Sequence, residues 1–82
     1  MVKDYPHILV IDDDTRLRSL LQRYLQENGF AVSAAKDAEN ARMFLHQYQF
    51  NLLIVDVMMP GESGIEFLQK LRCDNDVPAI VL

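Results

Sequence analysis

The segment LLIVDVMMPGESG, residues 52–64, decides how this chain folds. Four strongly apolar residues end at a single carboxylate, Asp56, and two methionines, a proline and two glycines come after it. A short, continuous apolar run is typical of a strand that is buried on both faces of a sheet. A carboxylate at the end of such a strand needs a partner, because burying an unpaired charge is costly. The segment therefore predicts a central strand that delivers a functional carboxylate to the edge of a sheet.

The rest of the chain alternates short apolar runs with stretches of helical spacing. Besides LLIV, the strands are predicted at HILVI (7–11), FAVSA (30–34) and VPAIVL (77–82). This β-α-β-α-β-α-β order indicates an α/β fold with right-handed crossovers and helices on both faces of a parallel sheet. The apolar residues that mark the three intervening helices are Leu17, Leu20, Leu21, Tyr24 and Leu25; Ala38, Ala41, Phe44, Leu45 and Tyr48; and Ile65, Phe67, Leu68 and Leu71.

The strand order follows from which runs are apolar on both faces. The first and third runs are, as central strands must be, whereas FAVSA alternates like a strand with one less-covered face. We therefore expect the order 2-1-3-4. In such a sheet the chain reverses direction between the first and third strands, and ligands bind at that switch point, outside the carboxyl ends of the strands. The acidic run Asp12, Asp13 and Asp14 and the lone Asp56 are both predicted to lie there.

Carboxylates crowded at one point favour a divalent cation, because they otherwise repel one another. Mg²⁺ is the natural candidate, since it accepts one or two carboxylates plus carbonyl oxygens and leaves positions for phosphoryl oxygens. A carboxylate beside Mg²⁺ can act as a nucleophile towards phosphorus and form an aspartyl phosphate. The loop after Asp56 suits this chemistry, because Pro60 and Gly61 shape a turn and Gly64 permits close approach of the backbone.

Composition restricts the function classes. The 82 residues suffice for one small domain, and eight basic against twelve acidic residues give a net charge of −4, which disfavours direct binding of nucleic acid. The apolar runs are too short to span a membrane and the N-terminus lacks the apolar core of a signal peptide, so a cytoplasmic location is expected. The single cysteine, Cys73, excludes an internal disulfide and fits a reducing compartment.

Three features occur together in this chain: the acidic pair after the first strand, the Asp at the end of the third strand, and Pro60 and Gly64 at four and eight residues past that Asp. In this combination the chain resembles the receiver domain of two-component response regulators. The stretch DDDTRLRSLLQRYLQENGF is most similar to the OmpR-type winged-helix transcription regulators. The resemblance implies a flavodoxin-like doubly wound sheet and a sensor histidine kinase as phosphoryl donor. It also implies Asp56 as phosphoacceptor and Mg²⁺ ligand, Asp13 as a direct Mg²⁺ ligand, Asp12 as a ligand through water, and Met58 as a ligand through its main-chain carbonyl.

The same resemblance implies parts beyond the fourth strand. A receiver continues with a Thr or Ser, a fourth helix, a fifth strand ending in Lys and a fifth helix, so residues 1–82 are expected to be the N-terminal part of one receiver domain. DNA would be bound only through an output domain outside this chain. The open edge of the fourth strand and the partly covered sheet face predict association, for example as a homodimer.

Several alternatives stay open. A haloacid-dehalogenase-type phosphatase also uses an Asp nucleophile with Mg²⁺, but it requires a second acid where Met58 stands. The resemblance implies a phosphoacceptor that assists its own phosphorylation and is not an enzyme. The second alternative to this function is a chemically inert receiver fragment that only dimerises. Asp14 is expected to cap the first helix rather than bind metal. His7 and His46 are expected at surface or strand-entry positions, away from the acidic cluster.

Overall fold

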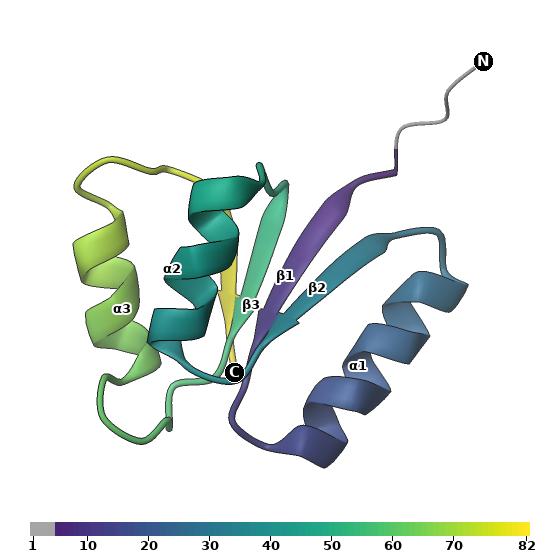
Figure 1. Ribbon diagram of the computed structural model, residues 1–82, viewed down its shortest axis with the longest axis horizontal. Helices are drawn as coiled ribbons and strands as arrows, with labels where there is room; N and C mark the ends of the chain where they lie inside the picture. Colours follow the sequence, from purple (N-terminus) through teal and green to yellow (C-terminus); the bar gives the residue numbers. More distant parts are fainter. Residues whose placement is uncertain (1–4) are drawn as a thin grey trace.

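The computed structural model describes residues 5–82, which form one four-stranded parallel sheet and three helices (Figure 1). The strands pair in the order β2-β1-β3-β4, which confirms the predicted α/β topology. Strands β1 and β3 lie at the centre, so the chain does reverse direction between them. The elements are β1 (His7–Ile11), α1 (Thr15–Glu27), β2 (Ala31–Ala35), α2 (Ala38–Gln47), β3 (Leu52–Val55), α3 (Gly64–Leu71) and β4 (Ala79–Val81).

Helices cover both faces of the sheet, with α1 on one face and α2 and α3 on the other (Figure 1). Successive residues of β1 serve opposite faces: Leu9 and Ile11 belong to the larger core cluster, which also holds Phe67 of α3. Ile8 and Val10 belong to the smaller cluster, against which α1 packs. The central strand is therefore buried on both sides, as its continuous apolar sequence predicted.

Polar side chains define where the helices begin. The Asp14 carboxylate accepts hydrogen bonds from main-chain amides of the first turn of α1, which confirms its predicted capping role. Asp37 caps α2 in the same way. At α3, Ser63 and Glu66 form a reciprocal capping box. These caps fix the points at which the chain leaves the carboxyl edge of the sheet and enters each helix.

Two predicted segments were too long. Tyr48 lies just past the end of α2 and is exposed, so it is not part of the apolar face of that helix. The strand predicted over residues 77–82 is limited to Ala79–Val81. Pro78 has no amide hydrogen to donate to a strand ladder, and the amide of Val77 donates instead to the side chain of Asn75.

The apolar residues of α1 divide into two groups. Leu21 and Leu25 pack against the sheet, whereas the outer ones are exposed. Ile80 of β4 is in register with Ile54, so its side chain lies on the α1 face, and it is exposed as well. Within residues 5–82, the sheet face on which α1 packs is therefore only partly covered, as the sequence predicted. The exposed apolar residues of α1 and of the segment around β4 are Leu17, Leu20, Tyr24, Ile80, Val81 and Leu82.

Candidate functional site

Three of the four acids expected at the switch point come together, and the fourth, Asp14, caps α1 instead. Asp12 follows β1 directly, Asp13 is the next residue, and Asp56 follows β3. Each offers a carboxylate oxygen, and these oxygens all lie within 4.8 Å of one another. The pairing of β1 with β3 explains the convergence, because Ile11 and Val55 are register partners and the carboxylates leave the same edge of the sheet. This is the lower edge in Figure 1.

Asp12 is the buried member of the cluster. Its exposed fraction is 1%, whereas Asp13 is exposed and Asp56 is half-buried. The Oδ1 atom of Asp12 accepts a 2.9 Å hydrogen bond from the amide of Asp14. The Oδ2 atom is buried and has no hydrogen-bond partner among residues 5–82. A buried carboxylate oxygen without a donor is an uncommon and costly arrangement, and a cation or its water would satisfy it.

The electrostatics of Asp12 agree with this geometry. Burial raises the pKa of the Asp12 carboxyl above its ordinary value, the hydrogen bond from Asp14 opposes that rise, and the negative charge of Asp56 adds to it. The buried carboxylate is thus unfavourable as an anion unless a positive charge compensates it. An all-oxygen donor set suits Mg²⁺. The residues present therefore fit such a cation, through Asp12, Asp13 and Asp56.

The backbone around Asp56 is held on two sides. Its amide donates to the carbonyl of Ile11 at 2.9 Å, and its Oδ1 atom accepts from the amide of Met58 at 3.2 Å. A Cβ atom on Gly64 would collide with the carbonyl oxygen of Asp56 and lie 2.9 Å from a methyl group of Val55. The predicted need for close approach at Gly64 is confirmed, because α3 begins directly against the strand that carries Asp56.

The remaining site predictions concern the loop and the histidines. Gly61 has φ +75°, so it supplies the left-handed conformation of the turn predicted after Pro60. The Met58 side chain is exposed, whereas its main-chain amide donates to Asp56 Oδ1. His7 begins β1, at the end of the strand opposite to Asp12, and its Nε2 atom lies 2.9 Å from the hydroxyl of Ser33. His46 is exposed in the last turn of α2. Neither histidine belongs to the carboxylate cluster.

Arg18 contacts the acidic turn, a role that the sequence did not predict. Its Nη1 atom donates a 2.7 Å hydrogen bond to the main-chain carbonyl of Asp12, and its Nη2 atom lies 3.5 Å from the hydroxyl of Thr15. The guanidinium thereby ties the first turn of α1 to the backbone of the acidic turn. The only signal available in the sequence was a basic residue in the second turn of a helix that begins at an acidic run.

A doubly wound parallel sheet with carboxylates gathered at its switch point is the architecture of α/β proteins that bind a ligand or an ion at the carboxyl edge of the sheet. The family model of the response regulator receiver domain matches residues 8–82. The chain belongs to the response regulator receiver family.

Relatives in sequence agree with this assignment. The chain is 48% identical over 77 residues to protein PetR of Rhodobacter capsulatus, an alignment that covers 94% of this chain and 32% of PetR. It is 44% identical over 75 residues to the transcriptional regulatory protein CpxR of Klebsiella pneumoniae, which covers 92% of this chain and 32% of CpxR. The chain thus spans about a third of the length of the curated relatives it matches.

Solved structures show the same fold. A response regulator receiver protein from Pseudomonas putida superposes with a TM-score of 0.91 at 33% identity, over 99% of this chain and 69% of that chain. The response regulator TrrA of Thermotoga maritima, solved in complex with Mg²⁺–BeF, superposes with a TM-score of 0.82 at 34% identity, over 93% and 65% of the two chains. Membership of the receiver family leaves the haloacid-dehalogenase alternative without support. Among residues 5–82, no helix is both long enough and apolar enough to cross a membrane.

Proposed function

We propose that this chain is the phosphoacceptor of a two-component system and that Asp56 receives a phosphoryl group from the phosphohistidine of a sensor histidine kinase. In the transfer, a carboxylate oxygen of Asp56 forms a bond to phosphorus, the bond from phosphorus to the imidazole nitrogen breaks, and the imidazole keeps that electron pair. The observation that carries the proposal is the cluster itself: three carboxylates within 4.8 Å at the switch point, one with a buried, unpaired oxygen.

The residues take separate roles in this proposal. Asp13 and Asp56 would hold Mg²⁺ directly, Asp12 would hold it through water, and the main-chain carbonyl of Met58 would complete the protein ligands. The bound cation supplies positive charge for the phosphoryl oxygens. The amide of Met58 donates to Asp56 Oδ1 and so orients that carboxylate. Pro60 and Gly61 shape the loop that carries Met58. The chain is itself the acceptor and is modified in the transfer, so in this proposal it is a phosphoacceptor that assists its own phosphorylation and not an enzyme.

The surrounding protein extends the proposal. We propose that residues 1–82 are part of one receiver domain in a cytoplasmic regulator, and that phosphorylation controls an output domain that binds DNA. Two curated relatives, CpxR and ResD, are named transcriptional regulatory proteins, and the chain covers less than a third of each. A charged group on Asp56 would bias a two-state surface that such a domain reads.

Association of two copies forms a separate part of the proposal. Within residues 5–82 the outer edge of β4 pairs with no strand, and it is rich in exposed apolar side chains. Exposed strand edges and apolar faces of this kind favour pairing with a second copy of the chain. We expect a homodimer by light scattering at high concentration. A monodisperse monomer under those conditions would contradict this part of the proposal.

The intact mass of the chain tests the phosphoacceptor role. We expect a single phosphoryl adduct after incubation with acetyl phosphate and Mg²⁺, and no adduct without Mg²⁺ or in the Asp56→Asn variant. Circular dichroism must show that each sample is folded. A folded wild-type chain that gains no adduct would instead support the alternative of an inert, dimerising receiver fragment.

A further inference from the structure

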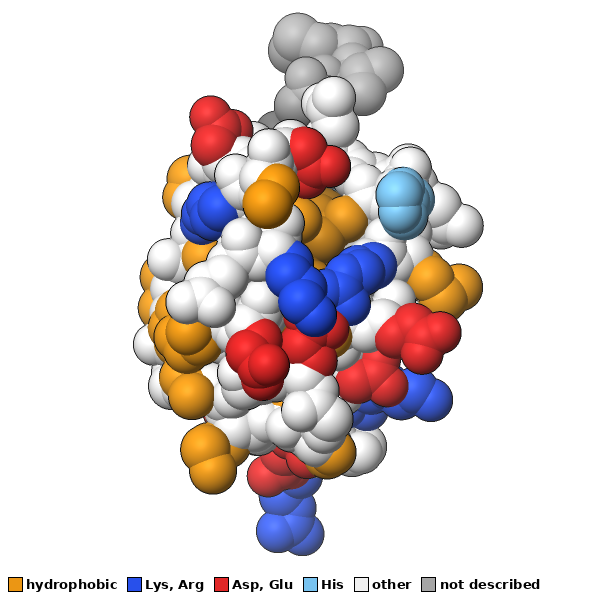
Figure 2. Space-filling model, turned by 90° about the vertical axis from the view of Figure 1, so that its left-hand side faces the viewer, with side chains coloured by type: hydrophobic (Ala, Val, Ile, Leu, Met, Phe, Trp, Pro, Cys, Tyr) orange, Lys and Arg blue, Asp and Glu red, His pale blue; other side chains and the backbone are white. Residues whose placement is uncertain are grey.

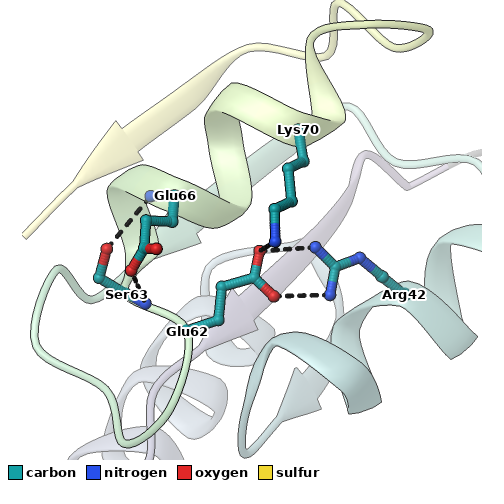
Figure 3. Close-up of polar contacts among 5 residues, drawn as sticks. All are labelled: Arg42, Glu62, Ser63, Glu66 and Lys70. Carbon is teal, nitrogen blue, oxygen red and sulfur yellow. Dashed lines mark hydrogen bonds and ion pairs between the residues drawn. The ribbon is translucent and has the colours of Figure 1, made fainter.

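Glu62 is an acidic side chain of the loop after Asp56, but it pairs with basic residues instead of joining the carboxylate cluster (Figure 3). Its two carboxylate oxygens accept hydrogen bonds of 2.8 and 2.7 Å from the two terminal nitrogens of Arg42, which lies on α2. The ammonium group of Lys70, on α3, lies 3.5 Å from Glu62 Oε2. We call these three residues the Glu62 clamp, because they join the loop to both neighbouring helices.

Within the Glu62 clamp, the pair of Arg42 and Glu62 differs from an ordinary surface ion pair in its burial and its geometry. The Glu62 side chain is only 17% exposed and the Arg42 side chain is 39% exposed. The guanidinium carbon of Arg42 lies 5.2 Å from the ring centre of Phe67, which is fully buried. Two parallel hydrogen bonds and a stacked guanidinium fix the pair in one geometry, which an isolated exposed pair lacks. On the face formed by α2 and α3, Figure 2 shows basic and acidic side chains side by side.

The clamp acts on the part of the loop that the main chain does not hold. At the start of the loop, Met58 donates to Asp56 Oδ1 and Val57 accepts from the amide of Gly64. At its end, the Ser63 amide donates to the Glu66 side chain of the capping box. Among the described residues, no main-chain hydrogen bond anchors residues 59–62, and this stretch includes the left-handed glycine. The buried side chain of Met59 and the Glu62 clamp therefore hold the middle of the loop.

We propose that Glu62 is a positioning residue for the phosphorylation site, and that with Arg42 and Lys70 it holds the loop so that the main chain of Met58 stays beside Asp56. This inference rests on the proposed function, since it is the Mg²⁺ site that the loop completes. A loop already ordered before the cation binds does not lose its freedom at that moment, so binding is tighter. Without the Glu62 clamp, the main chain of Met58 would become ordered only when the cation binds, and this loss of freedom would weaken binding.

The test compares Glu62→Gln with Arg42→Met, because positioning and simple charge predict different results. Glu62→Gln removes a negative charge, which by itself weakens attraction for a cation, whereas Arg42→Met removes a positive charge, which by itself strengthens it. Positioning predicts that both variants bind Mg²⁺ more weakly. We expect losses of roughly three- to tenfold, smaller than those caused by removing a direct partner of a metal ligand. The double variant should lose no more than the worse single variant, because the pair acts as one unit.

Mg²⁺ affinity is measured from the NMR shifts of main-chain amides near Asp56, with circular dichroism to confirm folding. Arg23→Met and Glu27→Gln are the matched controls, since both residues are exposed on α1 and carry the same two charges. The proposal is overturned if Arg42→Met and Glu62→Gln merely follow their controls or shift the affinity in opposite directions. A wild-type chain that does not bind Mg²⁺ would refute the proposed function, and this inference with it, before any variant is compared.

Discussion

The replacement Asp12→Asn removes the most deeply buried charge of the carboxylate cluster. Asparagine keeps the shape of the side chain and the oxygen that accepts from the amide of Asp14. Its amide group takes the place of the buried, unpaired Oδ2 atom. We therefore expect the variant to be more stable than the wild type when no divalent cation is present.

The magnitude follows from the distance between Asp12 and Asp56. Carboxylate oxygens of the two residues lie within 4.8 Å of each other, and two unit charges at that limiting distance repel by about 3.5 kcal/mol at an effective dielectric constant of 20. Solvent around Asp56 and Arg18 near the Asp12 backbone reduce this value, so we expect a net gain of about 1–2 kcal/mol in the free energy of unfolding. For a domain of this size, such a gain corresponds to a rise in Tm of about 5–15 °C.

The assay is thermal unfolding followed by circular dichroism, first in EDTA and then in Mg²⁺. Mg²⁺ at a hundred times its Kd would stabilise the wild type by about 2.7 kcal/mol, and it should stabilise the variant much less. The difference between the two proteins should therefore shrink or reverse when Mg²⁺ is added. The reasoning is refuted if Asp12→Asn is less stable than the wild type in EDTA, or if Mg²⁺ raises both Tm values equally.

Three further predictions follow from the same contacts. Gly64→Ala should destabilise the fold by about 2–3 kcal/mol, since the new methyl group meets the Asp56 carbonyl oxygen; unchanged denaturant unfolding would contradict this. Asp14→Ala should cost about 1 kcal/mol through the lost helix cap yet leave Mg²⁺ affinity unaltered in calorimetric titration, and a large loss of affinity would show that Asp14 belongs to the site. The pKa of the Asp12 carboxyl is raised in the folded state, so the folded state binds this proton more tightly than the unfolded state does, and the stability that the proton contributes is lost as pH rises through the raised pKa. The gain in stability from Asp12→Asn, measured in EDTA, should therefore grow with pH. A gain that does not depend on pH would contradict the assignment.

The sequence predicted the topology well because each strand signal was strong. Continuous apolar runs at β1 and β3 required burial on both faces, and this placed both strands at the centre of the sheet. The convergence of Asp12 and Asp56 then followed from the geometry of neighbouring parallel strands. The role of Gly64 was also predictable, since it stands eight residues past Asp56, where the third helix begins against the end of β3.

Other features depend on contacts that periodicity does not encode. The apolar spacing of α1 did not distinguish Leu21, which packs on the sheet, from Leu20, which is exposed, because neighbouring positions both fall within a broad apolar stripe. Arg42 and Glu62 lie twenty positions apart, and only the packing of α2 beside the loop brings them together. Long-range polar pairs of this kind leave no local pattern in the sequence.

The most direct test of the account is to locate the phosphoryl group on the chain. The chain is phosphorylated with acetyl phosphate and Mg²⁺, treated with borohydride to convert an acyl phosphate to the corresponding alcohol, digested, and sequenced by mass spectrometry. We predict homoserine at position 56 only, and only in samples that contained Mg²⁺. Modification at Asp12 or Asp13 instead, or a folded chain without any modified residue, would contradict the assignment of Asp56 as the phosphoacceptor.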